Sequence, residues 1–191
     1  VEPYFASGRS KLRLKAEARY TRAASGGTGA AKTSGNYAGT LKPMAEAITE
    51  GFDQILWLDG QTHQYAEEAG QMNVFFRIGD EVITPELSGT ILPGVTRDSV
   101  IQLLSDWGYT VSTRQMSIQE LKSASDAGIL NEMFGAGTAA VIAPIQSITL
   151  HDEELSVNAP NGPELSKRLL DTILGIQHGT IADTHGWTVK I

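Results

Sequence analysis

The sequence predicts a mixed α/β fold, because segments with the residue spacing of strands alternate with segments that have the spacing of helices along its 191 residues. Two observations on composition agree with a folded domain. Apolar residues make up 41% of the chain, far above the level of disordered chains, and a chain of this length can bury a core without cross-links. The absence of cysteine excludes disulfides, thiolate metal sites, iron–sulfur clusters and cysteine nucleophiles.

The first predicted element is a strand in which Leu12 and Leu14 alternate with charged residues. The first 22 residues carry six Lys or Arg against two Asp or Glu, a surplus of 6 − 2 = +4 in a chain whose formal net charge is −7. We interpret this surplus as the solvated face of the strand, with an anion-binding edge or a docking surface as the alternative. The net acidic charge makes nucleic acid a poor partner, and no apolar run is long enough to span a membrane.

A tract rich in glycine, alanine, serine and threonine follows at residues 25–39, and a helix is predicted from Asn36 to Glu50. The apolar residues of this helix recur at helical spacing, so we expect them to form its buried stripe: Leu41, Met44, Ala45 and Ile48. Residues 52–58 are mostly apolar, which predicts a buried strand.

The middle of the chain predicts a hairpin and two further helices. Residues 73–84 have the pattern of two short strands around a Gly-Asp turn. Residues 97–108 have apolar side chains on one helical face and end in a glycine. Residues 117–127 begin with a Ser-x-x-Glu capping box, which predicts the start of the next helix.

A strand and a helix are predicted in the last third of the chain. We expect the strand to run through Met133 and Phe134, to be interrupted by a glycine turn at residues 135–138, and to resume at residues 139–145. The helix has Pro163 in its first turn and Gly179 as its cap. Its predicted buried stripe consists of Leu165, Leu169, Ile173 and Ile176.

The glycine tract contains the first candidate for chemistry. Residues 26–33, GGTGAAKT, are one residue from the phosphate-binding G-x-x-x-x-G-K-T loop, because Ala31 stands where the second glycine belongs. The residues before the tract are too polar for the buried strand that such a loop follows, so a nucleotide-binding module is the lesser interpretation. Lys32 has small neighbours, and partial desolvation would favour the neutral amine that forms a Schiff base with an aldehyde. The alternative is an exposed loop lysine.

Other segments supply the groups that an aldehyde cofactor needs. The acidic pair Glu67-Glu68 precedes an apolar strand, and a carboxylate there can keep the ring nitrogen of a pyridine cofactor protonated; a surface acid is the alternative. Residues 94–96 precede a helix whose first N–H groups favour a phosphate, and the turn at residues 135–138 offers more N–H groups. The four histidines lack metal-ligand spacing, so we expect no metal site.

In combination, these segments resemble one enzyme family. The tract GGTGAAKTSGNYAG closely resembles the lysine segment of branched-chain amino acid aminotransferases, which are fold-type IV pyridoxal-phosphate enzymes. Three further segments agree in residues and spacing: residues 68–75, 83–85 and 92–97. Residues 132–139 resemble the family's turn, and residues 161–179 resemble its closing helix. The resemblance extends from about Tyr20 to the last residue of the chain. It implies an α/β pseudo-barrel that binds pyridoxal 5'-phosphate.

The resemblance also implies a role for each matching residue. Lys32 would form the Schiff base with the cofactor and would act as the base and acid that moves the α-proton. Tyr37 would hydrogen-bond the phenolic oxygen of the cofactor, Glu68 would pair with its pyridine nitrogen, and Leu92 would pack on its ring. The residues expected to hold the phosphate are Gly94, Val95, Thr96 and Thr138. Those expected to meet the substrate carboxylate are Gly137, Thr138 and Ala139.

The expected activity, by the same resemblance, is amino transfer from Leu, Ile or Val to 2-oxoglutarate, in the cytoplasm, by a homodimer or a higher homo-oligomer. The string GGTGxxKxxGNY favours this group over a D-amino acid aminotransferase or an aminodeoxychorismate lyase of the same fold. A catalytically silent fragment is a further alternative. The smaller N-terminal domain of the family, with its phosphate-binding arginine, has no counterpart in this sequence. We therefore expect a leading segment with an interdomain strand at residues 1–19 and the large cofactor-binding domain at residues 20–191.

Overall fold

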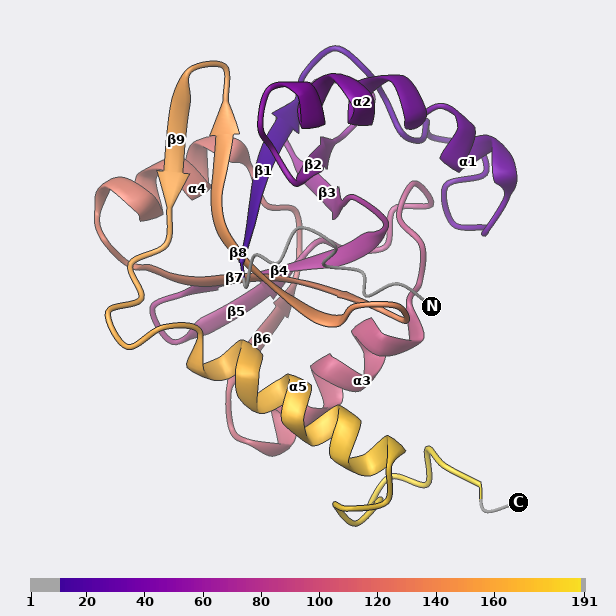
Figure 1. Ribbon diagram of the computed structural model, residues 1–191, viewed down its shortest axis with the longest axis vertical. Coiled ribbons are helices and arrows are strands. Elements are labelled where there is room, and N and C mark those ends of the chain that lie inside the picture. Colours follow the sequence, from indigo (N-terminus) through magenta and orange to yellow (C-terminus); the bar gives the residue numbers. More distant parts are fainter. Residues whose placement is uncertain (1–10, 190–191) are drawn as a thin grey trace.

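The computed structural model describes residues 11–189, which form nine strands and five helices (Figure 1). The strands are β1 (Leu12–Glu17), β2 (Gln54–Leu58), β3 (Ala66–Ala69), β4 (Met72–Ile78), β5 (Glu81–Thr84), β6 (Thr110–Thr113), β7 (Leu130–Gly137), β8 (Val141–Leu150) and β9 (Glu153–Ser156). The helices are α1 (Ser34–Ala38), α2 (Leu41–Thr49), α3 (Val95–Asp106), α4 (Ile118–Asp126) and α5 (Glu164–Gln177). Most of the leading segment predicted at residues 1–19 precedes the described range.

Six of these strands close into a barrel. The sheet runs in the order β3-β2-β1-β8-β7-β4, and β3 also pairs with β4, which joins the two ends. Strands β5 and β6 extend the sheet beyond β4, and β9 pairs with β8. The mixed α/β pseudo-barrel predicted from the sequence is therefore confirmed.

Two apolar clusters hold this arrangement together. The first is built from side chains of all six barrel strands and of α4, and it includes Val74 and Phe76 of β4. The second lies between the sheet and the helices α3 and α5, where Phe75 and Phe134 stack with their ring centroids 5.0 Å apart. Successive side chains of a strand point to opposite faces, so β4 contributes to both clusters. Burial on both faces explains the apolar run Val74-Phe75-Phe76 in its middle.

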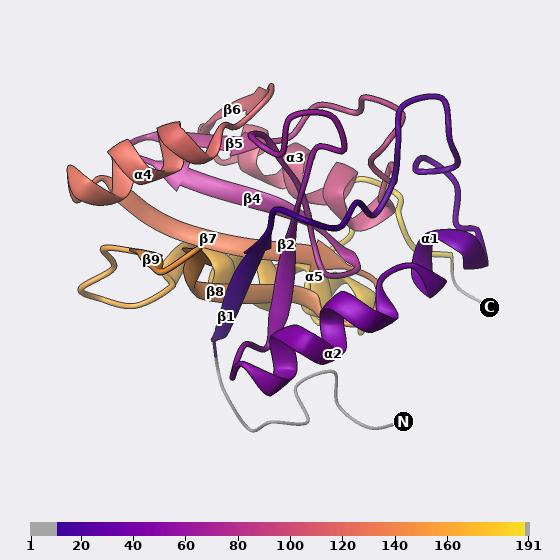
Figure 2. The same cartoon turned by 90° about the horizontal axis from the view of Figure 1, so that it is seen from above.

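The helices cover different parts of the barrel. Figure 1 shows α3 and α5 side by side at one end of the molecule, with α2 at the other end. Figure 2, turned by 90°, shows α2 alongside β2 and α4 near β9. Within residues 11–189, no helix is both long and apolar enough to cross a membrane.

The helix predicted from Asn36 to Glu50 is in fact two helices, separated between α1 and α2. Its predicted buried stripe is wrong for Leu41 and Ile48, which are 72% and 58% exposed, and for Ala45, which is also exposed. Met44 is half-buried and packs against the cluster beneath the helix. Helix α2 instead buries Pro43 and Ala47. Ala47 packs in one cluster with Ile55 and Trp57 of β2, and its small side chain lets the helix lie close to the sheet beside the bulky indole.

The expected interruption of the strand at residues 135–138 is also wrong. Strand β7 continues to Gly137, and the turn to β8 occupies residues 138–140. The reason is close packing: a Cβ atom added to Gly135 would lie 2.8 Å from the Met72 Cε atom. Glycine inside a strand often marks such a close approach rather than a turn.

The other elements predicted from the sequence are confirmed with small shifts of their ends. All four stripe residues of α5 are buried, and the hydroxyl of Ser117 accepts a hydrogen bond from the Glu120 N–H at 3.0 Å, which caps α4. Gly108 ends α3 in a left-handed conformation, with φ at +80°. Strands β3, β6 and β9 were not predicted, and each of them has only four residues.

Strand β1 lies inside the sheet and is parallel to both of its neighbours, β2 and β8. Its Leu12 and Leu14 are buried, as their alternation predicts, and Arg13 and Lys15 are half-buried. Because β1 is one of the barrel strands, it is continuous with the core of residues 20–189. The division of the chain after residue 19 stays a prediction.

Candidate active site

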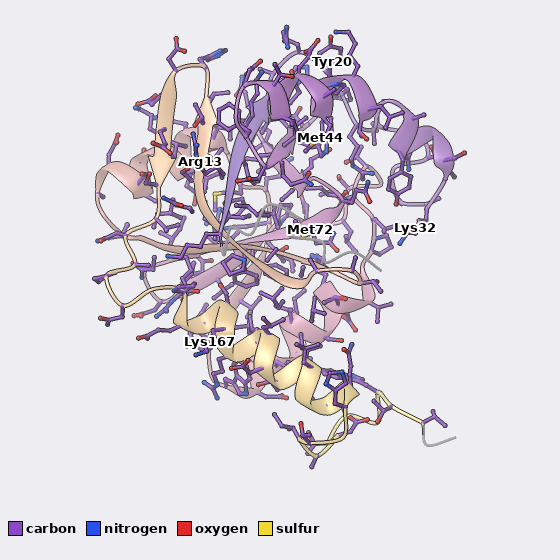
Figure 3. The ribbon with its side chains drawn as sticks, in the orientation of Figure 1. Arg13, Tyr20, Lys32, Met44, Met72 and Lys167 are labelled. Atoms are coloured by element: carbon purple, nitrogen blue, oxygen red, sulfur yellow. The ribbon has the colours of Figure 1, made fainter. Side chains whose placement is uncertain are left out.

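The glycine tract is held in shape by Asn36, the asparagine of α1. Its amide Nδ2 donates to the carbonyl oxygens of Thr28 and Ala31, both at 2.8 Å, and its Oδ1 accepts from the Thr28 hydroxyl at 2.8 Å. These three bonds fix the residues immediately before Lys32. In Figure 3 the Lys32 side chain points away from α1, toward the middle of the molecule.

Lys32 and Tyr37 take different positions around the start of α1. Lys32 is exposed and lies one residue before Thr33, the extended residue at the helix N-cap, whereas Tyr37 lies in the helix and is half-buried. Among the contacts of residues 11–189, none joins the Lys32 amine directly to Glu68. The tract and the acid are instead linked through Arg22, as described below.

Glu68 lies on β3 and is only 3% exposed, so its interpretation as a surface acid is wrong. Its neighbours across the sheet are Trp57 on β2 and Asn73 on β4. The carboxylate Oε1 accepts a hydrogen bond from the backbone N–H of Leu92 at 2.7 Å and lies 3.1 Å from the Arg22 guanidinium. Burial raises the pKa of Glu68 to about 7, against the opposing effects of Arg22 and of the Leu92 N–H.

The segment before α3 is fixed by Asn73. The Asn73 Nδ2 donates to the carbonyl oxygen of Leu92 at 2.8 Å, and a Cβ atom added to Gly94 would lie 2.2 Å from the Asn73 Oδ1. A larger residue at position 94 would therefore have to displace the Asn73 amide that holds Leu92. Val95 begins the helix, and the N–H of Asp98 is bonded to the Gly94 carbonyl at 3.1 Å. The N–H groups between them have no acceptor within the helix, so together with the helix dipole they favour an anion.

The turn between β7 and β8 lies close to the same asparagine. Ala136, the strand neighbour of Asn73, precedes Gly137, and Thr138 and Ala139 follow as exposed turn residues. Val141, the first residue of β8, has a φ of +56°, which is unusual for a β-branched side chain. The fold therefore carries the segments of Glu68, Gly94 and Thr138 on or beside β4, so that Asn73 is their common neighbour.

Arg22 connects the glycine tract to Glu68. Its Nη2 donates to the carbonyl oxygen of Thr90 at 2.6 Å and of Gly29 at 3.4 Å, and the same atom is the one that faces Glu68. A Cβ atom added to Gly29 would lie 2.5 Å from the Thr90 backbone, so the tract packs directly on residues 88–92. The tract, the acid and the segment before α3 thus form one connected site.

Three residues that assemble this site were missed from the sequence: Arg22, Asn36 and Asn73. Asn36 and Asn73 lie within blocks that carry the family resemblance, but nothing in their spacing indicates which backbone groups they bind. Arg22 belongs to the basic residues interpreted as a solvated face, whereas its side chain is only 5% exposed.

The structure disfavours a nucleotide-binding loop at residues 26–33. Such a loop follows a buried strand directly and starts a helix with its last residues. Here β1 ends at Glu17, well before the tract, and α1 has only five residues.

Comparison with known proteins identifies the family. The family model for class IV amino-transferases matches residues 4–148. The chain belongs to this family.

Class IV relatives match the chain in sequence over most of its length. The branched-chain-amino-acid aminotransferase 2 of Bacillus subtilis is 49% identical over 191 residues, which are 100% of this chain and 53% of that protein. The branched-chain-amino-acid aminotransferase of Mycolicibacterium smegmatis is 44% identical and matches over 98% of this chain and 52% of its own length. The chain therefore spans about half the length of the curated relatives it matches.

Solved class IV structures agree with the fold. The Escherichia coli branched-chain amino acid aminotransferase superposes with a TM-score of 0.77 at 28% identity, over 93% of this chain and 56% of that one. A branched-chain amino acid aminotransferase from T.th., complexed with N-(5'-phosphopyridoxyl)-L-glutamate, gives a TM-score of 0.78 at 28% identity, over 94% of this chain and 56% of that one. The pseudo-barrel described above is therefore the fold of these class IV enzymes.

Proposed function

We propose that this chain is the cofactor-binding part of a branched-chain amino acid aminotransferase, which transfers the amino group of Leu, Ile or Val to 2-oxoglutarate. The relatives that carry this name at 44–49% identity support the substrate class. The observation that carries the proposal is the buried carboxylate of Glu68, held on a barrel strand opposite the start of α3 and linked to the lysine tract. A surface acid would be solvated by water and would not require these buried contacts.

The described residues fit pyridoxal 5'-phosphate. Both contacts of the Glu68 carboxylate use Oε1, which leaves Oε2 for a protonated ring nitrogen. The free N–H groups at the start of α3 suit the phosphate, and Gly94 lets the backbone lie close to β4. Bound in this position, the cofactor would supply an electron sink for the substrate's Cα.

Each residue of the site has a distinct task in this proposal. Lys32 holds the cofactor aldehyde and carries the proton to and from the substrate's Cα. Glu68 keeps a negative charge next to the ring nitrogen, and Tyr37 donates a hydrogen bond to the phenolic oxygen. Leu92 packs on the ring. The phosphate is held by Gly94, Val95, Thr96 and Thr138, and the substrate carboxylate by the N–H groups of Gly137, Thr138 and Ala139.

Lys32 needs shielding from water to work in this way, but residues 11–189 leave it exposed. We infer that parts of the enzyme outside this matched half complete the site, in a homodimer or a higher homo-oligomer in the cytoplasm. Closure over Lys32 would exclude water and favour the neutral amine that attacks an aldehyde.

Cofactor binding by the purified chain tests the proposal. We expect a yellow absorbance band after addition of pyridoxal 5'-phosphate, and borohydride reduction followed by peptide mapping should find the label on Lys32. Lys32→Ala should abolish both signals. Lys167→Ala is the matched control, since Figure 3 shows this lysine on α5, far from Lys32. Labelling of other lysines with none on Lys32 would overturn the proposal.

Substrate choice separates the alternatives within the fold. We expect Leu, Ile and Val to discharge the yellow band and D-alanine to leave it unchanged. The reverse pattern would indicate a D-amino acid aminotransferase instead.

A further inference from the structure

Arg22 is a buried cation at the junction of three segments. Its guanidinium reaches the Gly29 carbonyl of the lysine tract, the Thr90 carbonyl of the segment before α3, and the carboxylate of Glu68 on β3. All three contacts are made by one nitrogen, Nη2. The Nε atom is also buried and has no hydrogen-bond partner among the described residues. A buried guanidinium with an unpaired N–H is costly, so the nearby carboxylate is needed to offset its charge.

Two carboxylates share this cation. Glu67 and Glu68 are adjacent on β3 and both are buried. Glu68 faces Arg22 directly, and Thr90 links Glu67 to it, because the Thr90 hydroxyl donates to the Glu67 Oε1 and the Thr90 carbonyl accepts from Arg22. Burial raises the pKa of the Glu68 carboxyl, and so does the negative charge of Glu67. The positive charge of Arg22 lowers it. Arg22 is thus the cation that favours the ionised form of Glu68.

The geometry also divides the two oxygens of Glu68 between different tasks. Arg22 and the Leu92 N–H both engage Oε1, at 3.1 and 2.7 Å, and together they fix the plane of the carboxylate. A carboxylate anchored through one oxygen presents the other in a defined direction. Loss of the guanidinium would leave only the Leu92 N–H, about which the carboxylate could rotate.

We infer that Arg22 is a positioning residue for the acid of the site: it orients Glu68 through Oε1, supplies a positive charge that favours the ionised form of this carboxylate, and couples it to the tract that carries Lys32. This inference rests on the proposed function only in its last consequence, the pairing of Glu68 with the ring nitrogen. The orientation and the charge of Glu68 are properties of the chain without cofactor.

Carboxyl titration in the cofactor-free chain tests the inference. The glutamate carboxyl carbons are labelled with 13C, and the Glu68 signal is assigned by its loss in Glu68→Gln. In Arg22→Met we expect the Glu68 pKa to rise by about 1–3 units, the size of effect that a neighbouring guanidinium has on a carboxyl. Arg22→Lys should restore part of the difference. Arg19→Met is the control, because Arg19 has a 62% exposed side chain and binds Glu46 on the surface.

An unchanged Glu68 titration in folded Arg22→Met would overturn the inference. If Arg22→Met does not fold, Arg22→Lys decides the question, since lysine keeps the positive charge but lacks the planar, fixed guanidinium. An Arg22→Lys protein with the Glu68 titration of the wild type would then refute the role of the guanidinium.

Cofactor binding gives a second readout that a merely structural role would not change. In Arg22→Lys we expect the pH at which the bound chromophore changes its spectrum to shift, while the folded content measured by circular dichroism stays the same. If the chain binds no pyridoxal phosphate, the proposed function fails, but the 13C titration still decides the role of Arg22. If the cofactor binds and neither titration shifts, only the role of Arg22 fails.

Discussion

Removal of the Asn36 side chain should loosen the tract that carries Lys32. In Asn36→Ala the carbonyl oxygen of Ala31 loses its amide donor and the Thr28 hydroxyl loses its acceptor. The Thr28 carbonyl keeps one bond, from the backbone N–H of Ala31 at 2.9 Å. The helix residues themselves are unaffected, because alanine is a good helix former.

The size of the effect follows from the three hydrogen bonds and from their exposure. Each is worth about 0.5–1.5 kcal/mol, and since Thr28 and Ala31 are exposed and water can replace Asn36, the lower part of this range applies, for a total of about 2 kcal/mol. If the tract must be ordered to bind the cofactor, this energy is lost from binding. The Kd for pyridoxal 5'-phosphate should then rise about 30-fold.

Two measurements check this prediction: spectroscopic titration with pyridoxal 5'-phosphate, and hydrogen exchange of the amides of residues 28–32, which should become faster. Asn161→Ala is the matched control, because Asn161 is an exposed loop residue before α5. A Kd within about twofold of the wild type, together with unchanged exchange in the tract, would refute the claim that Asn36 orders it.

Three further predictions concern other parts of the fold. Gly94→Ala should weaken cofactor binding at least about tenfold, because its Cβ would collide with Asn73 and displace the start of α3. Glu132→Gln should lower the free energy of unfolding in urea by about 1–2 kcal/mol, since Glu132 accepts the N–H groups of Leu165 and Ser166 and the Ser166 hydroxyl at the start of α5. The cofactor-free chain should lose stability as the pH rises from 4.5 to about 7, because burial raises the pKa of Glu68 and its proton favours the folded state. Glu68→Gln should reduce this loss, and the part that remains is expected from Glu67, whose pKa burial also raises.

Each of these predictions has a control or a contradicting result. Gly39→Ala should bind cofactor normally, because its added Cβ would have 3.9 Å to the nearest atom. Glu154→Gln, on the exposed face of β9, should leave unfolding unchanged. A stability profile for Glu68→Gln that is parallel to the wild type between pH 4.5 and about 7 would contradict the assignment of the pH effect to Glu68.

Local patterns predicted those elements whose burial is decided within the element itself. Helix α5 is the clearest case: its four apolar residues recur at helical spacing, Pro163 precedes it and Gly179 ends it. In α2 the same reasoning failed, because the face of the helix that packs on the sheet is decided by the space available next to Trp57 of β2. The small Ala47 occupies this space, and Leu41 and Ile48 are exposed to solvent. Periodicity indicates a helix but does not determine which neighbour it packs against.

The site was predictable in its chemistry but not in its assembly. The residue types at Lys32, Glu68 and Gly94 indicate the interactions expected with a pyridine aldehyde: a Schiff base, a partner for the ring nitrogen and a close backbone approach to the phosphate. Their connection depends on Arg22 and Asn73, whose backbone partners lie between 7 and 68 residues away. No local pattern encodes such contacts, since they exist only once the six strands have closed.

The place of β1 in the barrel has a consequence for how the chain folds. Leu14 pairs with Ile148 of β8, so the contact joins residues separated by most of the described chain. Such a contact forms only after a long loop has closed, so conformational entropy is lost before the contact stabilises the fold, and folding is slow. During synthesis the apolar side of β1 must therefore wait until β8 has left the ribosome, roughly ten seconds or more at typical rates of elongation. We expect the nascent chain to depend on chaperones in that interval.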